Sequence, residues 1–256
     1  TKQILGAVDF LAKMDLIHTD LKPENILAVD RAEIRVDNGF GQRVFVPATP
    51  TIKVIDLGGA TYDNEHKSST VNTRQYRAPE VILGLGWGFP SDIWSIGCIA
   101  AELYHGELLF GTHSNTEHIA LMEARVGPFP ARMVKDSPFS GRYFDSSGRS
   151  RTDALDPKDA AHVRKTVSLS QLVDRPEDAD FLELLRGLLV LDARDRLSDV
   201  VVGQVAGGAH APRARHNWQD LGRCMCFHST EGLGSLICNV GGMVALATDS
   251  AVLIKP

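Results

Sequence analysis

The chain has few cysteines, and they lack the pairing of a metal centre. Apart from one Cys-x-Cys, the cysteines stand alone in the sequence: Cys98, Cys224, Cys226 and Cys238. Cys98 lies in an apolar helical run, where a small buried thiol is the ordinary interpretation. We therefore expect a protein of a reducing compartment.

Long apolar runs and an excess of basic charge are also missing. No run reaches membrane-spanning length, and no basic segment leads into an apolar one near the start, so neither a transmembrane helix nor a signal peptide is predicted. The net charge of −5 gives no basic stripe for nucleic acid, but it is compatible with a basic peptide substrate. With 256 residues, the chain can bury a substantial core in one or two domains.

What the sequence does contain is a polar constellation in two short stretches. Asp20 and Asn25 stand five positions apart in a loop that carries Pro23, and Asp56 follows an apolar approach and precedes Leu57 and a Gly-Gly pair. In-line phosphoryl transfer requires a carboxylate that orients the attacking hydroxyl and accepts its proton, and it requires oxygen ligands for magnesium. The string His-Thr-Asp-Leu-Lys-Pro-Glu-Asn, followed by Asp-Leu-Gly, resembles the catalytic loop and the Asp-Phe-Gly motif of protein kinases.

Apolar periodicity predicts a helix and short strands around this constellation. Residues 3 to 15 have the spacing of an amphipathic helix, whereas residues 26 to 29 and 52 to 55 are typical of short strands. Between these strands, Asp-Asn-Gly at positions 37 to 39 is flanked by apolar pairs and predicts an inserted hairpin.

Further helices are predicted downstream. Ser91 or Asp92 is expected to cap a helix that is apolar on nearly every side and therefore buried, with Trp94 in the core. Ser114 and Glu117 form the signature of a capping box before a second helix.

The remainder of the chain is less regular. Residues 127 to 176 are predicted to be mostly loop, with room for short helices around residues 157 to 167, and residues 181 to 189 again form an amphipathic helix. Residues 203 to 256 hold eight glycines and only seven charged residues, without a sustained helical or strand period. We expect low order there, although apolar stretches between residues 235 and 254 could pair as strands.

With these residues together, the chain resembles the C-terminal lobe of a LAMMER-type (CDC-like) protein kinase of the CMGC group. The group resemblance rests on Arg-x-Tyr-Arg-Ala-Pro-Glu at residues 74 to 80 and on the run from Asp92 to Cys98. The subfamily resemblance rests on Thr19, on residues 84 to 87, and on residues 117 to 127, a relaxed version of the motif that names the family. The segment from Asp56 to Glu80 then corresponds to a kinase activation segment.

This resemblance implies a mainly α-helical, protein-kinase-like C-terminal lobe with a few short β-strands and a hairpin. The implied domains are an incomplete kinase domain over residues 1–198 and a divergent, glycine-rich tail over residues 199–256, in place of the family's final helix. A kinase also needs an N-terminal β lobe with a glycine-rich loop, a strand lysine and a helix glutamate, and the 19 residues before Asp20 contain none of these. We therefore expect that lobe to be absent from this chain and the chain by itself to be inactive.

The implied function is that of an ATP-dependent Ser/Thr or dual-specificity protein kinase, with ATP and Mg²⁺ as cofactors. Protein substrates in that family include Arg/Ser-rich splicing factors, and the implied location is nuclear and/or cytoplasmic. Carried over by position, Asp20 would be the catalytic base, Lys22 would steady the transferring phosphate and Thr73 would bond the catalytic loop. Asn25 and Asp56 would hold magnesium and with it the nucleotide. The alternative is a catalytically silent, kinase-like module that binds a partner through its activation segment or tail.

Two further expectations follow from the resemblance. It implies a buried ion pair between Glu80 and Arg196, which would stabilise the lobe. Thr19 stands where many kinases have an arginine that receives an activation-segment phosphate, and threonine cannot form that charge-assisted pair. We therefore expect activity without phosphorylation of the segment's hydroxyl residues, which are Ser68, Ser69, Thr70 and Thr73. Leu57 for the family's phenylalanine, and Gly59 for its serine, are departures, the first of which we expect to be tolerated.

Overall fold

The computed structural model describes residues 1–37, 43–197, 244–248 and 251–255. The helices are α1 (Lys2–Ala12), α2 (Pro79–Leu83), α3 (Pro90–His105), α4 (Asn115–Val126), α5 (Ala131–Asp136), α6 (Ser140–Tyr143), α7 (Pro157–Lys165), α8 (Leu169–Leu172) and α9 (Ala179–Leu188). Single 3-10 turns are η1 (Pro23–Asn25), η2 (Leu57–Gly59), η3 (Arg74–Tyr76), η4 (Thr152–Ala154) and η5 (Pro176–Asp178). Described strands pair antiparallel in twos: β1 (Leu16–Ile17) with β6 (Thr61–Tyr62), β2 (Ile26–Ala28) with β5 (Ile52–Val54), β3 (Glu33–Asp37) with β4 (Arg43–Pro47), and β7 (Val244–Thr248) with β8 (Ala251–Lys255).

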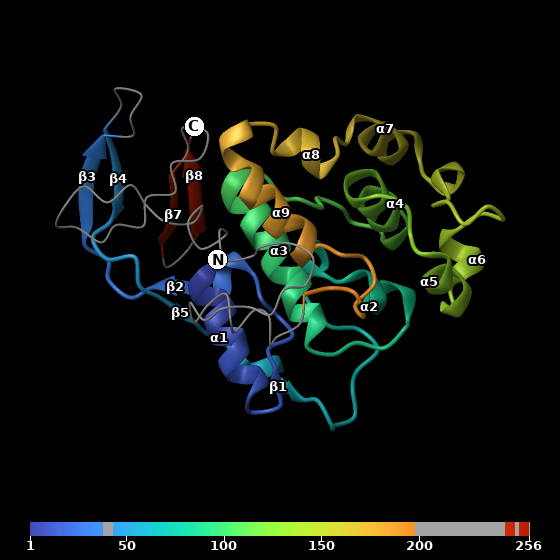
Figure 1. The fold of residues 1–256 in the computed structure, drawn as a ribbon, viewed down its shortest axis with the longest axis horizontal. Helices are drawn as coiled ribbons and strands as arrows, with labels where there is room; N and C mark the ends of the chain where they lie inside the picture. The colour runs from blue at the N-terminus through green and yellow to red at the C-terminus, as the bar shows by residue number, and fades with distance from the viewer. Residues whose placement is uncertain (38–42, 198–243, 249–250, 256) are drawn as a thin grey trace.

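Helix α3 is the centre of the core. Figure 1 shows it alongside α9, with α1 on one side and α4 to α7 on the other. All residues from Ser91 to Ala101 are buried, because neighbouring elements cover every face of the helix. Gly97 permits the close approach of α9: a Cβ built there would lie 2.8 Å from Leu189 Cδ2. Trp94 and Cys98 are both core residues, as predicted.

The predicted cap of α3 is wrong. The helix begins at Pro90, which tolerates the first helical position because it has no N–H to satisfy, and no side chain caps it. The Asp92 carboxylate instead accepts the backbone N–H groups of His18 and Thr19, at 2.7 and 3.0 Å. The hydroxyl of Ser91 is buried without a partner among the described residues.

The helix that begins after Ser114 is confirmed, but its capping box is only half formed. The Ser114 hydroxyl accepts the backbone N–H of Glu117 at 3.1 Å. The Glu117 carboxylate does not reach back to Ser114, because it bonds the Thr112 hydroxyl and His162 Nδ1. The two groups compete successfully for the oxygen atoms that a capping box would use.

The predicted loop between residues 127 and 176 is partly wrong, since it contains α5, α6, α7 and α8. Helix α7 lies within residues 157 to 167, where the sequence leaves room for short helices. Helices α5, α6 and α8 have six, four and four residues, too few for a 3.6-residue period to emerge from the sequence.

The strand predictions hold where the structure describes the chain. Strands β2 and β5 pair with Ile26 opposite Val54, and β3 and β4 form the inserted hairpin, whose turn at residues 38–42 lies outside the described residues. Strands β7 and β8 pair within the glycine-rich tail. The prediction of low order for residues 203 to 256 otherwise concerns positions outside the described residues.

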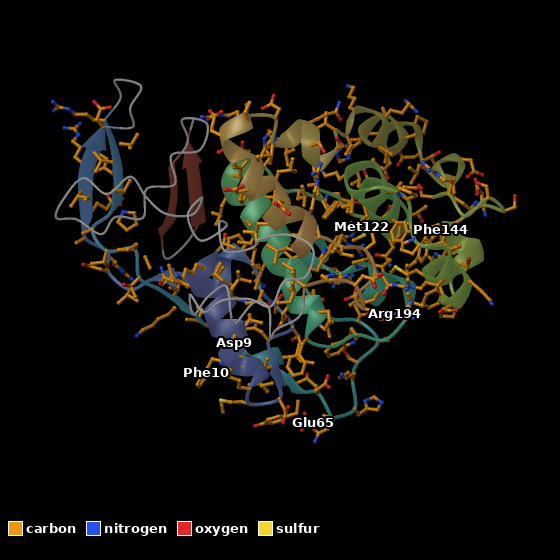
Figure 2. All side chains as sticks on the ribbon, viewed as in Figure 1. Asp9, Phe10, Glu65, Met122, Phe144 and Arg194 are labelled. Atoms are coloured by element: carbon orange, nitrogen blue, oxygen red, sulfur yellow. The ribbon has the colours of Figure 1, made fainter. Side chains whose placement is uncertain are left out.

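Apolar side chains lie both in the core and on the outer surface. Figure 2 shows Met122 of α4 and Phe144 on the inner side of the α4–α6 region, where both are buried, and Phe10 on the outer face of α1, where it is exposed. Among the described residues, no helix combines the length and the apolar character that a bilayer crossing requires.

Candidate active site

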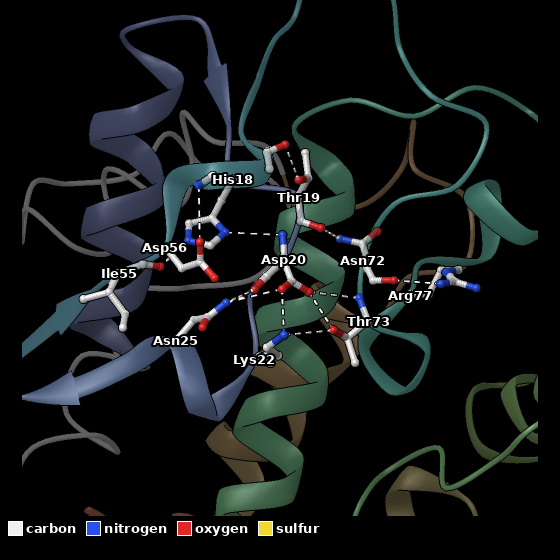
Figure 3. Close-up of polar contacts among 12 residues, drawn as sticks. His18, Thr19, Asp20, Lys22, Asn25, Ile55, Asp56, Asn72, Thr73 and Arg77 are labelled. Atoms are coloured by element: carbon white, nitrogen blue, oxygen red, sulfur yellow. Dashed lines mark hydrogen bonds and ion pairs between the residues drawn. The ribbon is translucent and has the colours of Figure 1, made fainter. Parts of the chain in front are cut away.

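Asp20 is the hub of the candidate site, in the loop between β1 and η1. Its Oδ1 accepts both the backbone N–H and the hydroxyl of Thr73, at 3.1 and 2.7 Å, and its Oδ2 accepts Lys22 Nζ at 2.7 Å. Lys22 Nζ also lies 3.3 Å from the Thr73 hydroxyl. The three residues predicted to be catalytic therefore meet in one cluster (Figure 3).

These contacts favour the ionised form of Asp20. Partial burial raises the pKa of the carboxyl, but hydrogen bonds from Lys22 and Thr73, and the positive charge of Lys22, outweigh that effect and hold the pKa below its ordinary value. At neutral pH the group is a carboxylate with its oxygen atoms in fixed directions.

Asn25 and Asp56 lie next to this cluster. Asn25 is buried at the end of η1, and its Nδ2 donates to the Asp20 carbonyl oxygen at 2.9 Å, which leaves the amide oxygen as the atom able to ligate a cation. The Asn25 carbonyl accepts the N–H of Ile55 at 2.9 Å, so Asp56, the next residue, is held beside Asn25. Figure 3 shows the Asp56 carboxylate on the same side as Asp20 and Asn25.

The backbone of Asp56 is left-handed, with φ of 66° and ψ of 70°. Aspartate adopts this conformation more readily than most residues, and here its side chain accepts the Gly58 N–H at 3.3 Å. The turn leaves Asp56 exposed, and it leaves the Leu57 side chain 50% exposed instead of packed. Among the described residues no group of three or more His, Cys, Asp or Glu could enclose a metal, so a cation here would depend on non-protein ligands as well.

Sequence reasoning missed the residues that hold the loop. His18 is fully buried, its Nε2 contacts the Ile55 carbonyl at 3.0 Å, and its backbone and that of Thr19 bond Asp92 on α3. The Thr19 hydroxyl donates to the Gly59 carbonyl at 2.8 Å. Burial raises the pKa of Asp92 to about 6, against the effect of the two N–H donors. The one available signal was an acidic residue inside an otherwise apolar helix.

Two further carboxylates lie close enough to Tyr76, in the activation segment, to raise the pKa of its hydroxyl. Glu24, on η1, is exposed, and Glu102, on α3, accepts the Tyr76 hydroxyl at 2.7 Å. Burial raises the pKa of Glu102, the Tyr76 bond opposes that rise, and the negative charge of Glu24 adds to it. Among the described residues, neither carboxylate pairs with a cation.

The expected ion pair behind the activation segment is confirmed. Arg196 donates through Nη1 and Nη2 to the two carboxylate oxygens of Glu80, each at 2.8 Å. Both side chains are buried, at 0% and 4% exposure. The pair fixes the start of α2, where the activation segment ends.

Comparison with known proteins identifies the family. The protein kinase domain family matches residues 1–207, so the chain belongs to the protein kinases, and the fold is the protein kinase fold. A crystal structure of a kinase domain matches with a TM-score of 0.70 and 38% identity, covering 78% of this chain and 62% of its own.

Within the kinases, the chain is of the LAMMER type in the CMGC group, as its motifs predicted. Dual specificity protein kinase lkh1 of Schizosaccharomyces pombe is 42% identical over 206 residues, which are 77% of this chain and 30% of the relative. Serine/threonine-protein kinase AFC2 of Arabidopsis thaliana is 40% identical over 208 residues, 77% of this chain and 49% of the relative. The chain thus spans half or less of the length of these two proteins.

The motif that names the subfamily is a structural element here. It occupies α4, where residues Glu117 to Glu123 are all buried. Arg125 donates to the Leu109 carbonyl oxygen at 2.8 Å, and Glu123 accepts the Ser150 N–H at 2.7 Å. The motif thus fastens α4 to neighbouring loops and contributes no group to the Asp20 cluster.

Proposed function

We propose that the chain supplies the catalytic lobe of an ATP-dependent protein kinase with Ser/Thr or dual specificity. The observation that carries this proposal is the Asp20 cluster, in which an ionised carboxylate is held by Lys22 and Thr73 beside Asn25 and Asp56. An amide oxygen and an exposed carboxylate suit Mg²⁺, which keeps water and substrate phosphates as its other ligands. When bound, Mg-ATP supplies the phosphoryl group and neutralises the charge that develops on it.

The residues of the chain divide the remaining work. Asp20 Oδ2, on the side away from Thr73, orients the attacking hydroxyl and accepts its proton. Because the pKa of Asp20 is low, the carboxylate orients the hydroxyl more effectively than it retains a proton. This suits phosphoryl transfer, in which positioning contributes more than proton transfer because the transition state is loose. Lys22 Nζ, 2.7 Å from that oxygen, is the cation placed to steady the transferring group. Thr73 holds the carboxylate in this orientation through two bonds.

We further propose that transfer requires an N-terminal lobe in addition to this chain. A kinase clamps its nucleotide between two lobes, and the strand lysine and helix glutamate must hold the phosphates in line. The 19 residues before Asp20 carry no glycine-rich loop or strand lysine. Leu57, next to Asp56, is 50% exposed, and we expect such a lobe to cover it.

For the substrate we propose Arg/Ser-rich proteins, such as splicing factors, in the nucleus and/or cytoplasm. Glu24 and Glu102 support this choice, because they place two negative charges without a cation beside Tyr76, three residues from Thr73. An arginine near the acceptor serine would gain charge-assisted bonds there.

The test uses the chain alone and fused to the N-terminal lobe of a LAMMER-type kinase. We expect no measurable transfer from the chain alone, and from the fusion we expect transfer to serine in an Arg/Ser peptide. Asp20→Asn should lower kcat by about 10²- to 10⁴-fold, whereas Asp136→Asn, the same change at an exposed position, should not. Transfer that survives Asp20→Asn would refute the roles assigned here. A folded, inactive fusion would favour the silent binding module.

The substrate proposal has its own comparison. Glu24→Gln with Glu102→Gln should lower kcat/KM for the Arg/Ser peptide by about 10- to 100-fold, the loss of one or two bonds to a charged group. The same pair of changes should leave an alanine-substituted, arginine-free peptide almost unaffected. Glu107→Gln, at an exposed position elsewhere, is the matched control. An equal loss of kcat/KM for both peptides would show that these carboxylates do not recognise the arginine of the substrate.

A further inference from the structure

Asn72 joins the activation segment to the catalytic loop through a single acceptor. Its backbone N–H donates to the Thr19 carbonyl oxygen at 2.9 Å, and its side-chain Nδ2 donates to the same oxygen at 3.0 Å (Figure 3). Asn72 is 7% exposed and Thr19 is 4% exposed, so water hardly competes for these bonds.

Both residues hold a left-handed backbone, with φ of 62° for Asn72 and 69° for Thr19. Asparagine tolerates this region, whereas a β-branched threonine rarely enters it, so surrounding bonds must fix Thr19 there. Those bonds come from Asp92, which accepts its N–H, and from Gly59, which accepts its hydroxyl. The Thr19 carbonyl is thereby aimed at the activation segment.

Burial of the Asn72 side chain has a free-energy cost. Its Oδ1 is buried without a hydrogen-bond partner among the described residues. A buried, unpaired amide oxygen is unfavourable, so what the side chain contributes in return is the Nδ2 bond. Its backbone carbonyl accepts Arg77 Nη2 at 2.8 Å, which fixes the other end of the residue. The next residue is Thr73, which places its N–H and hydroxyl on Asp20.

We propose that Asn72 is a positioning residue that holds Thr73 against Asp20 by clasping the Thr19 carbonyl, and so sets the activation segment without a phosphate. The clasp contains no charged group. In other kinases an arginine and a phosphate fix the activation segment to the catalytic loop, whereas here the Asn72 amide and a backbone carbonyl do so. The inference rests on the proposed kinase function for its effect on catalysis, but the clasp itself can be tested without activity.

The first test is amide hydrogen exchange on the full 256-residue chain. Asn72→Asp keeps the size of the side chain but replaces the donor with a second oxygen that faces the Thr19 carbonyl. Exchange in peptides covering residues 70 to 76 should accelerate by about 10- to 100-fold. Asn115→Asp is the matched control, since Asn115 contacts the same segment by accepting Arg74 Nη1 through Oδ1, which aspartate retains. Asn72→Gly, which keeps the backbone bond and the left-handed backbone, should accelerate exchange less than Asn72→Asp.

The second test uses the fusion kinase. Asn72→Asp and Asn72→Gly should lower kcat while leaving the KM for ATP unchanged. The kcat is calculated per folded protein, with the folded fraction measured by circular dichroism, because partial unfolding alone would also lower the apparent kcat at constant KM. Unchanged exchange in both variants would overturn the clasp, whether or not the fusion is active. Faster exchange with unchanged kcat in an active fusion would overturn the positioning role. A wild-type fusion without activity would refute the proposed function instead, and exchange alone would then decide the clasp.

Discussion

Arg196→Ala would leave the buried carboxylate of Glu80 without its partner. In the native chain the guanidinium forms two parallel bonds of 2.8 Å with that carboxylate. It also donates to three backbone carbonyl oxygens, those of Pro90 at 2.6 Å, Val190 at 2.8 Å and Leu191 at 3.1 Å. Truncation therefore removes one side of a buried ion pair and also frees three acceptors.

The magnitude follows from the burial of both partners. Removal of one member of a buried pair costs about 3 to 5 kcal/mol, because an uncompensated charge remains away from water. For a chain of this length, each kcal/mol lowers the melting temperature by roughly 2 to 4 °C, so we expect a fall of roughly 6 to 20 °C. Arg194→Ala provides the contrast: its side chain is 60% exposed, and its buried partner Asp192 keeps Arg132 as a second cation. No buried charge is left unpaired, so we expect the small loss typical of exposed pairs, about 1 kcal/mol or less.

The assay is urea and thermal unfolding of the three proteins, followed by circular dichroism and tryptophan fluorescence. Trp94 reports on the site directly, since the Arg196 guanidinium lies 5.1 Å from its ring centroid. A fourth protein, with Glu80→Met and Arg196→Met together, should recover much of the loss, because both charges are removed. If Arg196→Ala were no more harmful than Arg194→Ala, the reasoning from burial would be wrong.

Three further perturbations follow from the structure. Gly97→Ala should destabilise the chain by about 1 to 3 kcal/mol in urea, since the new Cβ would meet Leu189 at 2.8 Å; an unchanged midpoint would contradict close packing of α3 against Leu189. Asp92→Asn should cost about 1 to 3 kcal/mol and speed exchange of the His18 and Thr19 amides, because an NH₂ group must face one of the two N–H donors. Phosphatase treatment should leave the kcat of the active fusion unchanged, because Thr19 cannot form the charge-assisted pair with a phosphate that an arginine forms; loss of activity would show that a phosphate is needed.

The parts of the fold that the sequence predicted are those with local, repeating signals. The β3–β4 hairpin followed from alternating apolar residues around Asn38-Gly39, and the start of α4 followed from Ser114. The prediction of the α3 cap was wrong because the Asp92 carboxylate bonds the backbone N–H groups of His18 and Thr19, which lie 74 and 73 residues earlier. Nothing in the sequence near Asp92 indicates these partners. Short helices such as α6 were not predicted, because four residues are too few to show a helical period of apolar residues.

The candidate site divides in the same way. Asp20, Lys22 and Asn25 lie in one compact string, and the resemblance of that string to the kinase catalytic loop implied their roles. Thr73 lies 53 residues from Asp20, and only the family resemblance connected the two. The Asn72 clasp gave no signal at all, because its acceptor is a backbone carbonyl, which every residue possesses. Contacts of this kind depend on backbone conformation, and the sequence does not display it.

One helix supports both halves of the candidate site. Asp92 on α3 holds the catalytic loop, and three residues later Ser95 donates its hydroxyl to the Tyr76 carbonyl at 2.8 Å and so holds the activation segment. Both residues are buried, so each anchor moves only if α3 moves. Because the two anchors are one helical turn apart, a displacement of α3 would shift both loops together instead of separating Asp20 from Thr73. The distance between the two anchors is therefore set by the geometry of a helical turn. The Asn72 clasp restrains the parts of the catalytic loop and activation segment that lie beyond these anchors.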